Sequence, residues 1–173
     1  MIIIHAVQKL LNISKLKPAL FISEPSTLQD LHPWYAKLLS STYRGKMLVM
    51  YVHQPSLFII VTKGKTVTST VNEFHVRLEA FLHRQGFDTD FIKKEMRLVK
   101  EGYIISKTNS RSMLGSMNAI GENVEHMCYT FRSYEAIDFD YIEDSFMDWL
   151  VTDKTRPYYF RRTSDYWKEK GLI

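Results

Sequence analysis

The sequence predicts a single α+β domain, with an antiparallel sheet of about five strands packed against two long helices and shorter C-terminal elements. Three short apolar segments lie at 34–41, 46–53 and 57–63, separated by turn-forming residues at the spacing of an antiparallel meander. Apolar residues at helical spacing then mark two long helices, at 67–85 and 111–130.

The other strands are short. The β-branched stretch "MIIIHA" predicts a strand near 2–6, and "GYIIS" predicts another near 103–106. The run from Leu57 to Val61 is continuously apolar, so we expect its strand to lie inside the sheet with both faces covered. Gly86 suits a left-handed cap at the end of the first long helix.

The helix at 111–130 has an apolar face and a polar stripe. A glycine inside a helix costs about 1 kcal/mol relative to alanine, so each needs a reason. We expect Gly121, in the apolar face, to permit the close approach of another backbone. Gly115 is less easily explained by core packing, because it lies beside the polar stripe, which consists of Ser112, Ser116, Ala119 and Asn123.

The composition favours one globular domain spanning 1–173. Cys128 is the only cysteine, so no intramolecular disulfide can form and we expect a cytoplasmic location. No signal peptide is recognisable, and no stretch approaches the roughly 20 apolar residues of a membrane helix, so we expect no membrane partner. The net charge of +4 is a milder excess than dedicated nucleic-acid binders carry.

Two apparent motifs do not support catalysis or a cofactor. Gly64, Lys65 and Thr66 follow an apolar segment, but a phosphate loop needs a glycine where Ile59 stands, so we interpret them as a turn with Thr66 as an N-cap. The histidines show no i, i+4 pair of the kind that binds a metal. We therefore expect no metal and no cofactor.

The C-terminal third separates acidic from basic residues. Glu143 and Asp144 belong to an acidic stretch whose spacing suits the solvated face of an amphipathic helix. In "RPYYFRR", Arg156, Arg161 and Arg162 are interleaved with aromatic residues, a pattern that suits single-stranded nucleic acid. Alternatively, these aromatic side chains pack a C-terminal strand and helix onto the sheet.

The segment "KTNSRSMLGSMN" holds the main candidate site. A strand ending near Ser106 delivers the chain to a helix N-terminus, and such ends bind phosphate, sulfate or carboxylate. The alternative is a cap whose polar stripe packs on another element. The predicted anion-binding residues are Lys107, Asn109, Ser110, Arg111, Ser112 and Ser116.

The same segment, with "QKLL" and the "W-x-A" of Trp34 and Ala36, resembles a bacterial family catalogued only as a domain of unknown function. Its members share a Lys-Thr step, an Arg-Ser or Lys-Ser step, and a Gly-Ser-Met-Asn step at this spacing. The resemblance covers nearly the whole chain in outline, and its specific part is 107–118. It implies a domain boundary and no chemistry.

Two classes of function stay open. The first is a binding or regulatory module that recognises an anionic partner, either a nucleic acid or an acidic protein segment. The second is a small enzyme acting on a phosphorylated or nucleotide-like substrate. An enzyme needs an acid–base group beside the anion, and the candidates are His5, His53 and Glu122.

Overall fold

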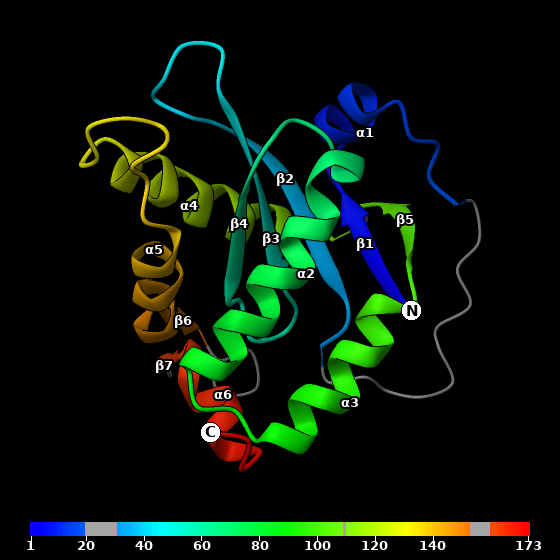
Figure 1. Cartoon of the computed structure of the whole chain (residues 1–173), viewed down its shortest axis with the longest axis vertical. Helices are drawn as coiled ribbons and strands as arrows, with labels where there is room; N and C mark the ends of the chain where they lie inside the picture. Colours follow the sequence, from blue (N-terminus) through cyan, green and yellow to red (C-terminus); the bar gives the residue numbers. More distant parts are fainter. Residues whose placement is uncertain (20–30, 109, 153–159) are drawn as a thin grey trace.

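The computed structural model describes residues 1–19, 31–108, 110–152 and 160–173 (Figure 1). The prediction of an α+β fold is confirmed, and the expected strands and long helices begin and end within a few residues of their predicted bounds. The elements are β1 (Ile2–Ala6), α1 (Gln8–Ser14), β2 (Trp34–Ser40), β3 (Met47–His53), β4 (Ile59–Lys63), α2 (Val67–Arg84), α3 (Thr89–Lys100), β5 (Tyr103–Lys107), α4 (Arg111–Cys128), α5 (Phe139–Ser145), a short 3₁₀ helix η1 (Phe146–Asp148), β6 (Leu150–Thr152), β7 (Phe160–Arg162) and α6 (Thr163–Glu169).

The main sheet is mixed, with the strand order β4-β3-β2-β1-β5. Strands β2, β3 and β4 form the predicted antiparallel meander. The prediction of a wholly antiparallel sheet was wrong, because β1 pairs in parallel with both β2 and β5. The connections explain the difference: α1 and the chain after it separate β1 from β2, and α2 and α3 separate β4 from β5. Such long crossovers let the chain return in the same direction.

Strand β4 lies at one edge of the sheet, so the prediction of an interior strand was wrong. Its two faces are nevertheless covered, as expected: Ile59, Ile60 and Val61 are fully buried. Helices α2 and α5 both contact this strand. Leu57 has a φ of 66° and lies outside the strand, which begins at Ile59.

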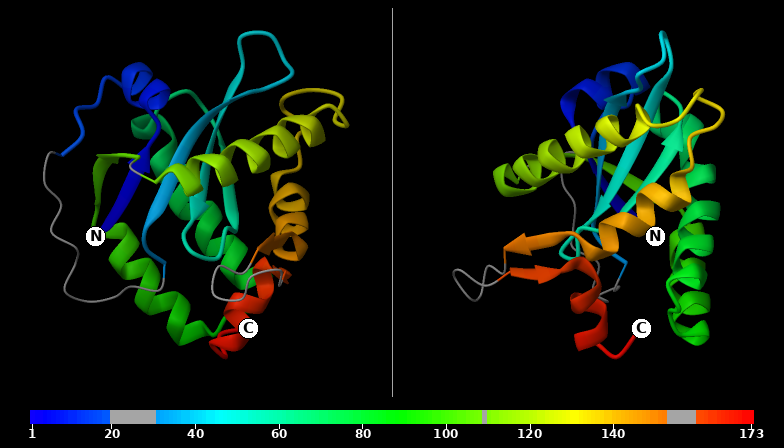
Figure 2. Two further views of the ribbon diagram at one scale, coloured as in Figure 1. Left: turned by 180° about the vertical axis from the view of Figure 1, so that it is seen from behind. Right: turned by 90° about the vertical axis from the view of Figure 1, so that its left-hand side faces the viewer.

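Helices cover both faces of the sheet. Figure 1 shows α2 and α3 in front of the sheet, and Figure 2 shows α4 crossing the opposite face. One apolar core joins α1, α2 and α3 to the first face, and a second joins α4 and α5 to the other. Two of the predicted helix signals hold: Thr66 caps α2 by accepting the Ser69 N–H at 3.1 Å, and Gly86 has a positive φ of 76°.

Helix α4 packs closely on the sheet at Gly121. A Cβ added there would lie 2.9 Å from Leu39 Cδ2 and 3.3 Å from Lys37 Nζ. The neighbours are therefore side chains of β2 and β3, and the expected backbone approach is wrong. The side chains of β2 occupy the space that a Cβ would need, which explains a glycine at this helix position.

Candidate functional site

Two adjacent parallel strands, β1 and β5, have their carboxyl ends side by side, where Ala6 lies opposite Lys107. After β1 the chain enters α1, whose leucines join the core of the α2 face. After β5 it enters α4, which packs on the other face (Figure 2). Ligands of open α/β sheets bind beyond the carboxyl ends of parallel strands, where neighbouring connections depart to opposite faces. We call the region beyond the carboxyl ends of these two strands the β1/β5 switch point.

Those predicted anion-binding residues that the structure describes lie at this switch point, where β5 passes into the first turns of α4. Lys107 and Arg111 are exposed, and neither forms an ion pair with a described residue. Ser110 is the N-cap of α4, because its Oγ accepts the Met113 N–H at 3.2 Å. Asn109 lies outside the described residues. Two cationic side chains therefore flank the first turn of a long helix.

The polar stripe of α4 faces outward. Ser112 is exposed and Ser116 is half-buried. A Cβ added at Gly115 would meet no heavy atom within 4 Å. Open space therefore lies beside Gly115, and the first turns of α4 are accessible along this stripe.

His5 brings a titratable group to the switch point. Its ring stacks on Tyr35, with 4.7 Å between ring centroids. Thr108 Oγ1 donates to the His5 carbonyl at 3.3 Å, which ties the start of the β5–α4 connection to β1. Burial lowers the pKa of His5, and a hydrogen bond with the Lys107 backbone offsets part of this change. The buried Nδ1 atom has no hydrogen-bond partner in the described structure.

The other two catalytic candidates lie elsewhere. His53 is fully buried at the end of β3, opposite Trp34 at the beginning of β2, and its Nδ1 lies 2.7 Å from Ser56 Oγ. The strand register places His53 level with Ile4 of β1 and two strands away from it, and not beside Ala6 and Lys107. Glu122 is exposed about three turns into α4. His5 is thus the one proposed acid–base residue that the fold brings beside the predicted anion site.

The C-terminal arginines that the structure describes are engaged within the molecule. Arg161 Nη1 lies 3.9 Å from Glu169 Oε2, and Arg162 Nη1 lies 3.3 Å from Asp148 Oδ1. Arg156 lies outside the described residues. A nucleic-acid contact at these arginines stays a prediction, and it would have to compete with these ion pairs.

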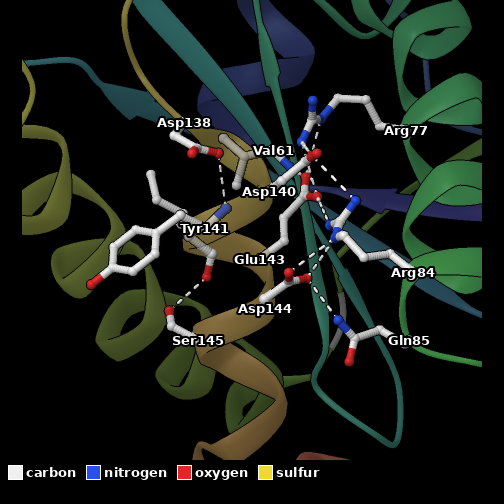
Figure 3. A network of polar contacts seen from close by, with 11 residues as sticks. Val61, Arg77, Arg84, Gln85, Asp138, Asp140, Tyr141, Glu143, Asp144 and Ser145 are labelled. Atoms are coloured by element: carbon white, nitrogen blue, oxygen red, sulfur yellow. Dashed lines mark hydrogen bonds and ion pairs between the residues drawn. The ribbon is translucent and has the colours of Figure 1, made fainter.

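A second charged site joins α2 to α5 at the edge of β4 (Figure 3). Its centre is Glu143, which is fully buried. Glu143 Oε1 accepts the Val61 N–H at 3.0 Å, so a carboxylate covers an outward-facing donor of the edge strand. The Glu143 cluster consists of Arg77, Arg84, Asp140, Glu143 and Asp144.

The two arginines of this cluster hold the buried carboxylate. Arg77 Nη2 lies 2.9 Å from Glu143 Oε2, and Arg84 Nη2 lies 3.3 Å from the same oxygen. Burial nevertheless raises the pKa of Glu143 to about 7, against the opposing effect of the arginines and the Val61 N–H.

The prediction that Glu143 lies on a solvated helix face was wrong. The sequence holds a signal that was missed: Glu143 lies four residues after Phe139 and three before Phe146, on the apolar face of the helix. An acidic residue at such a position indicates a buried partner of opposite charge.

The described ranges contain no group of three or more His, Cys, Asp or Glu side chains placed to hold a metal ion. Among the helices described, none has the length and apolar character needed to cross a membrane.

The comparisons with known proteins agree with the expected kind of family. No curated protein matches this chain. The family model described as a domain of unknown function, DUF6933, matches residues 3–160. That match covers most of the 173 residues, so the chain belongs to the DUF6933 family.

Proposed function

We propose that the protein is a binding module that recognises an anionic partner, a nucleic acid or an acidic protein segment, at the β1/β5 switch point. The observation that carries the proposal is the placement of exposed Lys107 and Arg111 at the carboxyl edge of two parallel strands with divergent connections. The first turn of α4 adds partial positive charge at the same place.

The chemistry of the site suits phosphate or carboxylate oxygens. Lys107 supplies a flexible point charge, whereas Arg111 can donate two parallel hydrogen bonds to one anionic group. The open space beside Gly115 leaves room for a group larger than a single ion along α4. A partner with several anionic groups could therefore follow the stripe of Ser112 and Ser116.

Calorimetry at low ionic strength tests the proposal with inorganic phosphate, a single-stranded oligonucleotide and an oligoglutamate peptide. The double substitution Lys107→Ala with Arg111→Ala should weaken binding of the recognised anion at least tenfold, since each hydrogen bond to a charged group contributes about 1.5–3 kcal/mol. For the oligonucleotide, the salt dependence should also become shallower, because fewer counterions are released.

The matched control is Lys93→Ala with Arg97→Ala, which removes one exposed lysine and one exposed arginine from α3, the helix that precedes the amino end of β5. This control should bind like the parent protein. Equal weakening by both double substitutions would indicate a diffuse charge effect and contradict the proposed site. Absence of binding to all three probes would reject anion recognition.

A second candidate, a small enzyme acting on a phosphorylated or nucleotide-like substrate, is favoured by His5. Its lowered pKa keeps the imidazole neutral near pH 7, which is the form that a general base requires. If the protein is an enzyme, His5→Gln should abolish turnover of phosphomonoesters or nucleotides while phosphate binding persists. Absence of turnover by the parent protein would leave the binding role alone.

We also propose a cytoplasmic location, on the strength of the single cysteine. Cell fractionation with an antibody against the protein tests this location.

A further inference from the structure

The connections at the carboxyl end of the main sheet carry basic residues and no acidic ones. They follow β1, β2, β4 and β5, which all run in the same direction, and occupy 7–19, 41–46, 64–66 and 107–112. The whole chain has 23 basic and 19 acidic residues, so the fold gathers positive charge at one end of a nearly balanced molecule. We call this set of residues the basic edge: Lys9, Lys15, Lys17, Arg44, Lys46, Lys65, Lys107 and Arg111.

Contacts between these connections bring them to one surface. Val67 N–H donates to Ser14 Oγ at 3.1 Å, which joins the end of α1 to the start of α2. Gly64 N–H donates to the Met47 carbonyl at 3.1 Å, which joins the β4–α2 turn to the start of β3. Figure 1 shows α1, the start of α2 and the β2–β3 hairpin at the same end of the sheet.

The cations of the basic edge are available to a ligand, because every one of these side chains is exposed. Two carboxylates approach the β2–β3 hairpin: Glu135 lies 4.0 Å from Lys46 Nζ, and half-buried Glu125 accepts the Ser40 N–H at 2.8 Å. The other cations of the edge form no ion pair with a described residue. By contrast, Arg84 on α2 contacts three carboxylates. Uncompensated positive charge is therefore concentrated at the basic edge.

The basic edge is too long for one small anion. Adjacent strands lie about 4.8 Å apart, so the strand order places the β2–β3 hairpin roughly 10–14 Å from β5 along the row of strand ends. A ligand that contacts both Lys107 and Arg44 must therefore carry repeated negative charges. A nucleic-acid strand has this property, with one phosphate per about 3.4 Å of duplex axis.

The exposed side chains of these connections favour a nucleic-acid backbone over an acidic protein segment. Protein interfaces are anchored by aromatic and apolar side chains that become buried. Within the described part of these connections, Ile13 is the only large apolar side chain that is exposed, at 41%. Contacts to a nucleic-acid backbone rely instead on lysine and arginine side chains that neutralise phosphates.

We propose that the basic edge binds the phosphate backbone of a nucleic acid, which passes from the β1/β5 switch point to the β2–β3 hairpin. This proposal rests on the anion site proposed above, and it adds Arg44 and Lys46 as contacts to further phosphates. Because phosphate contacts carry no direct sequence information, binding should depend little on base sequence.

Calorimetric titration of the whole protein with an oligothymidylate of about twelve nucleotides tests the proposal. Arg44→Ala with Lys46→Ala should weaken binding roughly fivefold or more at low salt. The slope of log affinity against log salt should also become shallower by about 1.4, as expected for two lost contacts to a single strand. The matched control, Lys93→Ala with Arg97→Ala, should bind like the parent protein, and circular dichroism checks that both variants are folded.

Inorganic phosphate distinguishes this proposal from the anion site on which it rests, because one ion cannot span the basic edge. The variant with Arg44 and Lys46 replaced should bind phosphate like the parent protein. If phosphate binds but oligothymidylate does not, or if this variant binds oligothymidylate as tightly as the parent, the nucleic-acid proposal is overturned and the anion site stands.

Two other results would also be decisive. Oligothymidylate binding that needs Arg44 and Lys46 but not Lys107 and Arg111 would reject the switch point as the anion site, and with it the proposed path of the backbone. Tighter binding of an oligoglutamate with the same number of charges would assign the basic edge to an acidic protein segment and overturn the nucleic-acid proposal.

Discussion

Replacing Glu143 by Ala should destabilise the fold by about 3 kcal/mol, because it removes a fully buried carboxylate that two arginines and a strand N–H share. Removing one partner of a buried ion pair costs roughly 3–5 kcal/mol. The lower end applies here, since Arg77 and Arg84 keep Asp140 and are only partly buried, with 19% and 25% of their side chains exposed.

Urea denaturation followed by circular dichroism measures this loss. For a domain of this length, about 3 kcal/mol corresponds to a fall in Tm of roughly 6–12 °C. Asp140→Ala is the matched control, because it removes a carboxylate from the same cluster whose side chain is 56% exposed. That substitution should cost less than about 1 kcal/mol.

The comparison between the two variants tests the reasoning directly. If Glu143→Ala and Asp140→Ala lower the free energy of unfolding by the same amount, burial does not determine how much each carboxylate of the cluster contributes to stability. A loss below about 0.5 kcal/mol for Glu143→Ala would show that α5 does not depend on this carboxylate.

Three other predictions concern pH, helix α4 and the single cysteine. Burial raises the pKa of Glu143 to about 7 from 4.5, so the folded protein keeps a proton that the unfolded chain has released. Relative to Glu143→Gln, the free energy of unfolding measured by urea denaturation should therefore fall as the pH rises from 4.5 to 7, and a rise would contradict this. Gly115→Ala should raise the free energy of unfolding by up to about 1 kcal/mol, because the new Cβ meets no neighbour. Gly121→Ala should raise it less, because the new Cβ meets Leu39. Equal melting temperatures of the two variants would refute this difference. Burial raises the pKa of the Cys128 thiol to about 11, so a thiol reagent near pH 8 should label the native protein far more slowly than the urea-unfolded chain, and equal rates would contradict the buried position.

Much of the fold follows from local sequence patterns. The alternation of apolar segments and turn residues predicts the meander of β2, β3 and β4, and helical spacing predicts α2 and α4. The parallel direction of β1 and β5 could not be predicted in the same way, because a short β-branched segment has the same composition in a parallel and in an antiparallel pair. Their pairing depends on contacts between residues far apart in the sequence, such as Ile3 with Ile104.

The sites differ in how far the sequence reveals them. Lys107 and Arg111 are only four residues apart in the chain segment that forms the predicted anion site, so their proximity could be foreseen. His5 joins them only through the pairing of β1 with β5. Glu143 and Arg77 are 66 residues apart, and their contact depends on how α2 and α5 pack at the edge of β4. A helix projection places Glu143 on an apolar face but cannot identify its partner.

The most direct test of the anion site is a titration of isotope-labelled protein with inorganic phosphate, followed by backbone amide and histidine ring NMR. We predict saturable shifts in the amides of Ser110, Ser112 and Met113, together with the ring of His5. Shifts that are absent from these groups, or that appear equally around Lys65, would contradict an anion site at the β1/β5 switch point.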